Sequence, residues 1–414
     1  MTANRPNPNR MSWRSIRQLA GQATVVLSCI LVFLTAAAIV NAADSRSQQE
    51  EAAAEFQQIV EKNFDAWDHD HDASIGPKDI NRLIASPHIA GSSAAAVVLV
   101  RRRFSTSQGD GKPTAFTKDQ LLELAGDRKA MSSFISLCKR IDTIFREVFV
   151  PTDPNLEGFH QGHEGDCYLL SVAGAFLERN PKALRAMFQE LGIRGVEVKF
   201  GNGRKVVVPP LTDSEVVLGA EVDAQHGVWL SVLEKAWAAI NEEDQEKRTG
   251  TTVEADAEIT NDIIGHGGNP GRVIAAFTGH KVEGFKWYKS QTDLGEDRAA
   301  DFLKTMTDSK FLVSLTTAAK GKAAAGLVLP PGMGSHHAYA LLGYDSANRT
   351  AKVFNPWGNT YKPKGPPGLE FGYPTEHGVF EVPVKELVHI FSGSSHETNK
   401  PIPPTPSQPK PAGH

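Results

Sequence analysis

Apolar positions recur with helical periods through the first third of the chain. Between Asp44 and Trp67 they are spaced three and four residues apart, which predicts an amphipathic helix. A second helical stretch runs from Lys129 to Phe149, with its apolar residues on one broad face. Pro151 and Pro154 end this stretch, and the residues that follow them are predicted to be a linker.

The middle of the chain contains a run that is apolar on every face, YLLSVAGAFL from Tyr168 onward. Such a run predicts a helix buried within a domain. Two glycines precede it, and Asp166 is a favourable N-cap residue, so Cys167 is expected in the first turn. Another helix is predicted over residues 227–241, because its apolar residues form one face.

The second half of the chain alternates apolar and polar residues, which predicts strands. The expected strands are a hairpin over residues 195–210 and single strands over 310–317, 335–345 and 350–355. A tight turn joins the last two, so they should pair antiparallel. His337 and Asn355 then lie at the same end of the pair. The pattern as a whole indicates an α+β protein.

Composition restricts the possible functions. The 414 residues are 40% apolar and 22% charged, which is enough for two or three domains with cores of their own. The formal charge of -4 provides no basic face, and 8% aromatic residues provide no stacking surface. Nucleic-acid binding is therefore not expected.

The N-terminus has the character of an export signal or a membrane anchor. Residues 1–22 contain four arginines and no acid, and an apolar run follows from Ala23 to Val40. Small residues before position 43 favour cleavage after Ala42, but about 18 apolar residues could also remain as one membrane span. In both cases the body of the protein is expected outside the membrane, periplasmic or extracellular, either free or tethered.

Three cysteines are present, and Cys29 lies in the export segment. Cys138 belongs to the apolar face of residues 129–149 and is expected in the core. Cys167, at a helix start, should have a lowered pKa and act as a nucleophile. Gln161, six residues upstream, could donate to an oxyanion beside the sulfur. A disulfide between Cys138 and Cys167, or simple packing of Cys167 in a core, remain alternatives.

The predicted strand pair supplies partners for a thiol. An imidazole needs a group on its second nitrogen to fix its orientation, and an Asn carbonyl serves where the nucleophile is a thiol. A single His in a strand is more often structural. The Asn355 that lies across from His337, together with Cys167 at its helix start, favours the catalytic interpretation.

Residues 68–79, DHDHDASIGPKD, follow the first helix and match most of an EF-hand calcium loop. Oxygen ligands fall at positions 1, 3, 5, 7 and 12, which are Asp68, Asp70, Asp72, Ser74 and Asp79. Ala73 replaces the usual glycine, and Asp79 replaces the usual glutamate. Both changes should weaken the binding of Ca²⁺ and relatively favour the binding of Mg²⁺. Calcium is the expected cofactor, and a solvated acidic turn is the alternative.

Two further segments complete the pattern. Residues 114–124 echo the helix start after the acidic loop, and their preceding loop, residues 105–113, has one acid and no ligand spacing. The loop and the helix start together predict a second, degenerate EF-hand that pairs with the first and binds no metal. The tail, residues 399–414, is rich in proline and is expected to be extended or disordered.

Four segments together resemble the calpain family of papain-like cysteine proteases. QGHEGDCYLL (residues 161–170) is similar to the family's Q-G-x-x-G-D-C-W-L-L. The other three are similar to its helix, histidine and asparagine segments: LEKAWAAIN (233–241), HAYALLGYD (337–345) and FNPWGN (354–359). All four occur in the family's order.

The resemblance implies a papain-like core of a helical half and a β-sheet half. It implies Cys167 as nucleophile, His337 as general base and acid, Asn355 as the group that orients the imidazole, and Gln161 as oxyanion donor. Trp357 would shield the bond between His337 and Asn355 from water.

Three features depart from the family pattern. Tyr168 replaces the usual Trp after the cysteine, and His336 replaces a glycine. The family's C2-like and C-terminal calcium-binding domains are not expected here, so calcium dependence does not transfer automatically.

The sequence therefore predicts a calpain-like, calcium-dependent-type cysteine endopeptidase that acts on proteins or peptides. The expected division is a signal or anchor (1–42), an EF-hand-like helical domain (43–128), a helix and linker (129–155), a catalytic domain (156–398) and the tail (399–414). Two alternatives remain open: a catalytically silent calcium-binding or adhesion module, and a papain-fold acyltransferase or amidase.

Overall fold

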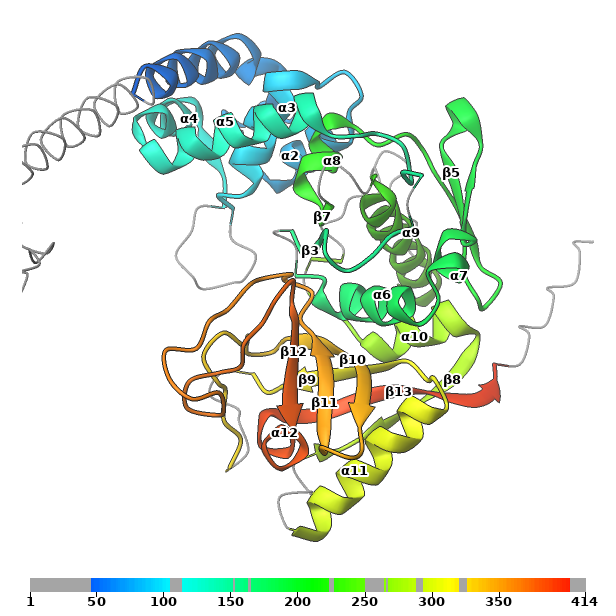
Figure 1. Ribbon diagram of the computed structural model, residues 1–414. Helices are drawn as coiled ribbons and strands as arrows, with labels where there is room; N and C mark the ends of the chain where they lie inside the picture. The colour runs from blue at the N-terminus through cyan, green and yellow to red at the C-terminus, as the bar shows by residue number, and fades with distance from the viewer. Residues whose placement is uncertain are drawn as a thin grey trace, which may run out of the picture.

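The computed structural model describes most of the chain (Figure 1). The described ranges are residues 46–104, 114–151, 153–162, 165–222, 227–249, 264–265, 267–287, 293–319 and 326–402. The predicted export segment, the predicted second loop at 105–113 and most of the proline-rich tail lie outside these ranges. Within the described residues, no helix combines the length and apolar character that crossing a membrane requires.

An N-terminal helical unit, defined here as residues 46–143, packs around its own core (Figure 1). It consists of a helix over residues 46–67, α2 (Pro77–Ala85), α3 (Gly91–Arg101), α4 (Lys118–Glu123), the short η1 (Leu124–Gly126) and α5 (Arg128–Thr143). Two short strands, β1 (Ser74–Ile75) and β2 (Phe116–Thr117), pair antiparallel across it. Phe56 and Phe134 meet edge to face in the core, so the predicted apolar faces pack on each other.

A segment from later in the chain completes this core. Val217 and Leu218 of α8 (Asp213–Leu218) are buried among the helices of the N-terminal unit. The Thr212 hydroxyl donates to the Ile84 carbonyl at 2.5 Å, and the Arg102 guanidinium donates to the Val217 carbonyl at 3.0 Å. The helical unit and the rest of the chain therefore share one packed interface.

The helical half of the remaining chain surrounds a second core. Its elements are α6 (Cys167–Arg179), α7 (Pro181–Arg185), α9 (Trp229–Thr249) and α10 (Pro270–Thr278), with a three-stranded sheet of β4 (Phe188–Glu190), β5 (Val196–Lys199) and β6 (Lys205–Val208) beside them. The short η2 (Gly192–Arg194) connects β4 and β5. Strands β3 (Phe159–His160) and β7 (Glu221–Val222) form a separate antiparallel pair, and β3 shortly precedes α6 in the sequence.

The other half is a six-stranded antiparallel sheet, ordered β12-β11-β10-β9-β13-β8. Its strands are β8 (His280–Phe285), β9 (Val313–Thr317), β10 (Ala338–Asp345), β11 (Thr350–Phe354), β12 (Val379–Pro383) and β13 (Phe391–Pro401). One face packs on α6 and α10, while α11 (Asp293–Asp308) and α12 (Val384–Ile390) cover the other (Figure 1). Side chains alternate between these faces: Ala340 belongs to the core under α6 and Tyr339 to the core over α11 and α12.

The mixed helix and sheet architecture agrees with the predicted α+β class, and several boundaries differ, including the end of α9 at Thr249 rather than Asn241 and the start of β9 at Val313 rather than Lys310. Helix α5 ends at Thr143 rather than Phe149, because Ile144 adopts an extended backbone (ψ 135°). Strand β10 begins at Ala338 rather than Ser335, so His336 and His337 precede the strand.

Candidate active site

Helix α6 places Cys167 at its first residue, as the sequence predicts. Asp166 occupies the N-cap position, but its side chain makes no capping bond. Its carbonyl instead accepts the N–H groups of Leu169 at 2.8 Å and Leu170 at 3.1 Å. The Asp166 carboxyl is therefore left for another partner.

Small residues let α6 lie directly on the sheet. A Cβ on Gly174 would come within 2.6 Å of the Phe354 ring, and the hydroxyls of Ser171 and Ser314 hydrogen-bond at 3.1 Å. This close approach brings the N-terminus of α6 to the start of β10. There the backbone N–H of Ala338 donates a hydrogen bond to the Cys167 sulfur.

His337 and Asn355 lie within hydrogen-bond distance. Nε2 of His337 is 2.8 Å from Oδ1 of Asn355, an oxygen that also accepts the Trp357 N–H at 3.1 Å. The amide nitrogen of Asn355 donates to Oδ1 of Asn359 at 3.1 Å, which fixes the amide orientation. Since an amide oxygen only accepts, Nε2 carries the proton and Nδ1 is left as the basic nitrogen.

The two adjacent histidines have different environments. His337 is buried, whereas His336 is exposed and has a left-handed backbone (φ 50°). The N–H of His336 donates to the Ala318 carbonyl at 2.9 Å. The predicted strand over residues 335–345 would have put the two side chains on opposite faces by alternation, but this backbone turn before β10 separates them instead.

Aromatic rings enclose the imidazole of His337. The Trp357 ring lies with its centroid 4.6 Å from that of His337, and the Tyr339 ring meets the imidazole edge to face at 4.9 Å. Asn355 is only 1% exposed, while Trp357 is 41% exposed. The tryptophan therefore lies between the imidazole and solvent.

Gln161 connects the two halves of the site. Its backbone N–H donates to the Pro356 carbonyl at 2.7 Å, next to Asn355 and Trp357. Its side-chain Nε2 donates to Oδ1 of Asp166 at 3.2 Å, next to Cys167. The residue thus contacts both the cysteine segment and the asparagine segment.

Burial controls the protonation of the pair. It raises the pKa of the Cys167 thiol to about 11, although the N–H of Ala338 acts in the opposite direction. Burial also lowers the pKa of His337 to about 4, although the hydrogen bond that the imidazole donates to Asn355 acts in the opposite direction. The prediction of a lowered thiol pKa is wrong for this state, because loss of hydration outweighs the helix terminus. Both shifts favour the uncharged forms of the thiol and the imidazole.

Two other residues that the sequence singled out, Tyr168 and Cys138, pack in the protein core. Tyr168 is buried, and its hydroxyl accepts the Trp237 indole N–H at 3.2 Å, so it belongs to the core and not to an open cleft wall. Cys138 and Cys167 are both free thiols. Cys138 packs against the core of the helical unit, as predicted.

An apolar hollow of about 590 Å³ adjoins the site. Trp357 and Gly334 line it together with the exposed side chains of Val328 and Leu329. A Cβ on Gly334 would lie 2.7 Å from the Trp357 ring and 3.2 Å from Cβ of His337, so the hollow is in direct contact with the imidazole segment. It offers space for a substrate side chain.

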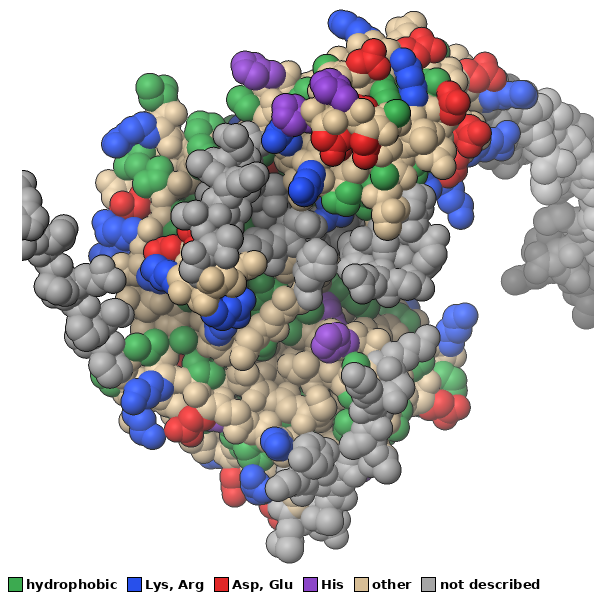
Figure 2. Space-filling view, turned by 180° about the vertical axis from the view of Figure 1, so that it is seen from behind, with side chains coloured by type: hydrophobic (Ala, Val, Ile, Leu, Met, Phe, Trp, Pro, Cys, Tyr) green, Lys and Arg blue, Asp and Glu red, His purple; other side chains and the backbone are tan. Residues whose placement is uncertain are grey.

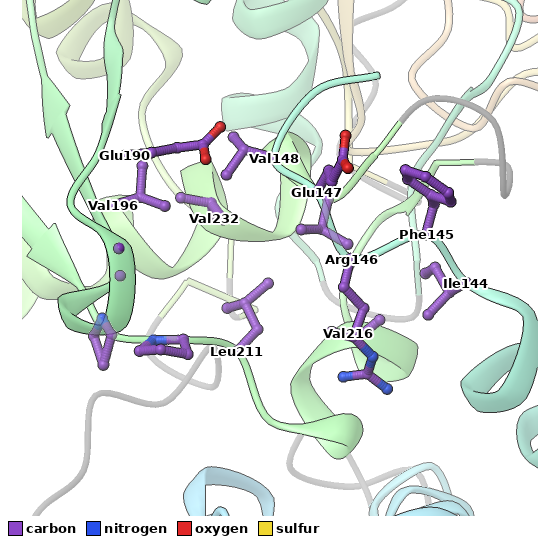
Figure 3. Close-up of a pocket in the computed structure, with 15 residues that line it drawn as sticks. Ile144, Phe145, Arg146, Glu147, Val148, Glu190, Val196, Leu211, Val216 and Val232 are labelled. Carbon is purple, nitrogen blue, oxygen red and sulfur yellow. The ribbon is translucent and has the colours of Figure 1, made fainter. Parts of the chain in front are cut away.

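A separate hollow of about 550 Å³ lies away from these residues (Figure 3). It is formed by residues 144–148, the β4–β5 edge, and apolar residues of α8 and α9, including Val216 and Val232. Neither Cys167 nor His337 lines it.

The acidic loop after residue 67 gathers carboxylates. Asp68, Asp70 and Asp72 can bring one oxygen each within 4.8 Å of one another, and Figure 2 shows acidic side chains beside histidines on this part of the surface. Ser74 donates its N–H and hydroxyl to Asp72 at 2.8 and 2.7 Å. Asp79 accepts the N–H groups of His69 and Gly76 at 3.1 and 2.9 Å, so it closes the loop.

Two comparisons with known proteins bear on this site. The family profile described as calpain family cysteine protease matches residues 135–366, more than half of the chain. The chain therefore belongs to the calpain family of cysteine proteases, and the resemblance in its four segments is confirmed. None of the curated proteins matches the chain.

Several residues that shape the site have little or no signal in the sequence. Asp166 was interpreted as a helix cap and Glu234 as part of a core helix, yet both are fully buried acids close to Cys167. Thr317, which holds the backbone of His337, gave no signal. An acid within an otherwise apolar helix face, as in LEKAW, was the one available signal for Glu234.

Proposed function

We propose that this member of the calpain family is a cysteine endopeptidase with Cys167, His337 and Asn355 as its catalytic triad. The observation that carries the proposal is the 2.8 Å bond between His337 and Asn355, which leaves Nδ1 of the imidazole as the base. The N–H of Ala338, the residue after His337, bonds to the Cys167 sulfur and keeps the two segments together.

The reaction would begin from the neutral pair. His337 Nδ1 takes the thiol proton as the sulfur attacks the peptide carbonyl, and the N–H of Cys167 and the Gln161 amide stabilise the oxyanion. The imidazolium then protonates the leaving amine, and the C–N bond breaks to give a thioester. Water, activated by the same imidazole, hydrolyses the thioester and restores the thiol.

Matched cysteine variants test this proposal. The full chain is incubated with a denatured protein before and after treatment with iodoacetamide, alongside Cys167→Ala and Cys138→Ala. Cleavage should be lost in Cys167→Ala, by a thousandfold or more, and retained in Cys138→Ala. No cleavage by the wild type would favour a silent module. Transfer to an added amine without cleavage of protein would favour an acyltransferase or amidase.

We also infer that the loop of residues 68–79 is an EF-hand-like cation site for Ca²⁺ or Mg²⁺. Three clustered carboxylates and the closing Asp79 provide the oxygen ligands that these cations prefer. Ala73 adopts φ 66° at the position where the loop pattern uses glycine, so the backbone follows the sharp turn of the motif. The antiparallel pairing of Ile75 with Phe116 is the expected link to a partner hand.

Cation binding has a physical route to the catalytic part. Helix α2 begins within the loop, at Pro77, and the Ile84 carbonyl near its end accepts the Thr212 hydroxyl at the start of α8. Hydrolysis measured in Ca²⁺, Mg²⁺ and chelator tests whether the cation modulates activity. Identical rates would leave the cation with a stabilising role only.

We propose that the protein is exported, on the basis of its N-terminal sequence alone. It is then either released after cleavage of the signal or tethered to the membrane by the uncleaved segment. Expression of the full chain in a bacterium, followed by fractionation and mass determination, distinguishes the two. A mature chain that starts at Ala43 supports cleavage, whereas an intact chain in the membrane fraction supports tethering.

A further inference from the structure

Two buried acids lie at the start of α6 and have no part in the reaction described above. Asp166 directly precedes Cys167, and Glu234 lies on α9; both side chains are fully buried. A buried carboxylate is costly unless hydrogen bonds or a proton compensate its charge. Their place beside the sulfur points to a role in the site.

Asp166 acts on Gln161. Its Oδ1 accepts the Gln161 side-chain N–H at 3.2 Å, and its backbone carbonyl alone caps α6. The Glu234 carboxyl reaches Asp166 from α9 as a further hydrogen-bond partner. One side chain therefore links the proposed oxyanion donor to a second acid.

Glu234 acts on the backbone opposite Gln161. Both of its oxygens accept the Ala220 N–H, at 2.9 and 3.0 Å. A Cβ on Gly219 would lie 2.5 Å from a Glu234 oxygen, so glycine is needed for this approach. The carboxyl thereby fixes the chain just before β7.

The pairing of β3 with β7 brings these contacts together. In the antiparallel register of the two strands, Gln161 and Ala220 are the next residues after the last pair. Gly162 packs so closely on the Gly219 carbonyl that a Cβ there would collide with it. Glu234 thus holds the backbone beside Gln161, and Asp166 holds its side chain.

We propose that Asp166 and Glu234 share one proton and act together as positioning residues, which hold the Gln161 amide where the oxyanion forms. The inference rests on the proposed protease function of Cys167. With one proton between them, the two acids add a single negative charge behind the sulfur, and the protonated acid donates to the other.

The surroundings of the pair support a change of charge within the working pH range. Burial raises the pKa of Asp166 to about 6, while hydrogen bonds from Glu234 and Gln161 act in the opposite direction. The other titratable or charged groups around the pair are Cys167 and Tyr168 on α6, His337 before β10, Arg272 on α10 beside Tyr168, and Lys235 on α9, which is paired with Glu215 of α8.

Steady-state kinetics of the full chain on a quenched peptide give the first test. Asp166→Ala should lower kcat by about 10²-fold and leave KM within about twofold, because an oxyanion donor acts mainly in the transition state. Asp166→Asn should recover most of that loss, since the Asn oxygen can accept the same bond from Gln161. Equal kcat values for Asp166→Ala and the wild type would overturn the inference.

The pH profile of kcat gives a readout that a purely structural role would not change. The wild type should show an inflection near pH 6. Asp166→Asn should lack it, and Glu234→Gln should move it to lower pH, because a Gln amide donates to the Asp166 carboxylate. An inflection that persists in Asp166→Asn would rule out a shared proton.

Controls separate positioning from folding and from the protease assignment. Glu397→Gln alters another buried acid, paired with Arg179 at 2.6 Å, and should change stability without changing the pH profile. If Asp166→Ala does not fold, Asp166→Leu, which also removes the acceptor of the Gln161 bond, is measured alone and in a double mutant with Gln161→Ala. Additive losses in kcat would contradict the coupling.

The wild type and Cys167→Ala are measured first. If the wild type hydrolyses no peptide, the protease function fails and the present inference fails with it. If the wild type is active, Cys167→Ala is inactive and Asp166→Ala matches the wild type, only the inference about the acids is lost.

Discussion

The hydroxyl of Thr317 accepts the backbone N–H of His337 at 3.0 Å and donates to the Gly334 carbonyl at 2.8 Å. Thr317 is the last residue of β9, so the sheet itself fixes the backbone from which the imidazole projects. The side chain is 2% exposed, and water cannot replace it.

Thr317→Val should therefore weaken both stability and activity. The change leaves a buried N–H and a carbonyl without their partner, which costs roughly 1–3 kcal/mol in the free energy of unfolding. We expect urea denaturation to show this loss and kcat to fall by about tenfold. Thr317→Ser keeps the hydroxyl and should behave almost as the wild type; equal losses in both variants would contradict the hydrogen-bond account.

Asn355→Ala should reduce kcat by roughly 10²-fold, because the imidazole loses the acceptor that fixes its Nε2–H. Peptide hydrolysis gives the rate, and thermal unfolding shows whether the fold is kept. Asn359→Ala is the control, since the Asn359 side chain accepts from the amide nitrogen of Asn355 and leaves the oxygen that faces His337 in place. A larger loss in Asn359→Ala than in Asn355→Ala would contradict the proposed role.

His337→Ala should lower activity by several orders of magnitude, because the base that takes the thiol proton is removed. His336→Ala should cost at most about tenfold through cleft shape, because that side chain is exposed and its backbone turns away at φ 50°. Hydrolysis of one peptide by both variants is sufficient. Equal losses, or the reverse order, would refute the assignment of His337.

Stability should fall as the solution becomes acidic, with His337 as one cause. Its pKa is lowered to about 4 in the folded state, below the ordinary value of 6.5, so between these values the unfolded chain binds more protons. The contribution is complete above about pH 6.5 and disappears as pH falls towards 4, with a loss of about 2 kcal/mol by pH 5.

His337→Gln should have a correspondingly smaller difference in the free energy of unfolding between pH 7 and pH 5. Chemical denaturation at the two pH values measures it. An unchanged difference would show that the imidazole is not held neutral by burial.

Ala73→Gly should stabilise the acidic loop by about 1 kcal/mol, because Ala73 has φ 66° and glycine adopts this conformation freely. Calorimetry on the full chain should also show tighter binding of Ca²⁺. Asp70→Asn, which removes one of the three clustered carboxylates, should weaken binding. If none of the three proteins gives a heat of binding at millimolar Ca²⁺, the loop is a solvated acidic turn and not a cation site.

The sequence by itself determined the family and the local framework of the site. Cys167 begins its helix because two glycines and an acid precede an apolar run, and these signals act over a few residues. His337 and Asn355 lie at the same end of an antiparallel pair because a short turn joins β10 and β11, although the register of the pair shifts between Leu341 and Gly343. The family match over residues 135–366 confirms what the four short segments indicated.

Only the tertiary structure decided the electrostatics and the supporting contacts. The thiol pKa rises and the imidazole pKa falls because both groups lose water on burial, and burial depends on elements distant in sequence. The packing of α8 into the N-terminal core brings together residues more than a hundred positions apart. Asp166 and Glu234 meet for the same reason: periodicity specifies a helix face, but the partner of a buried acid depends on how the helices pack.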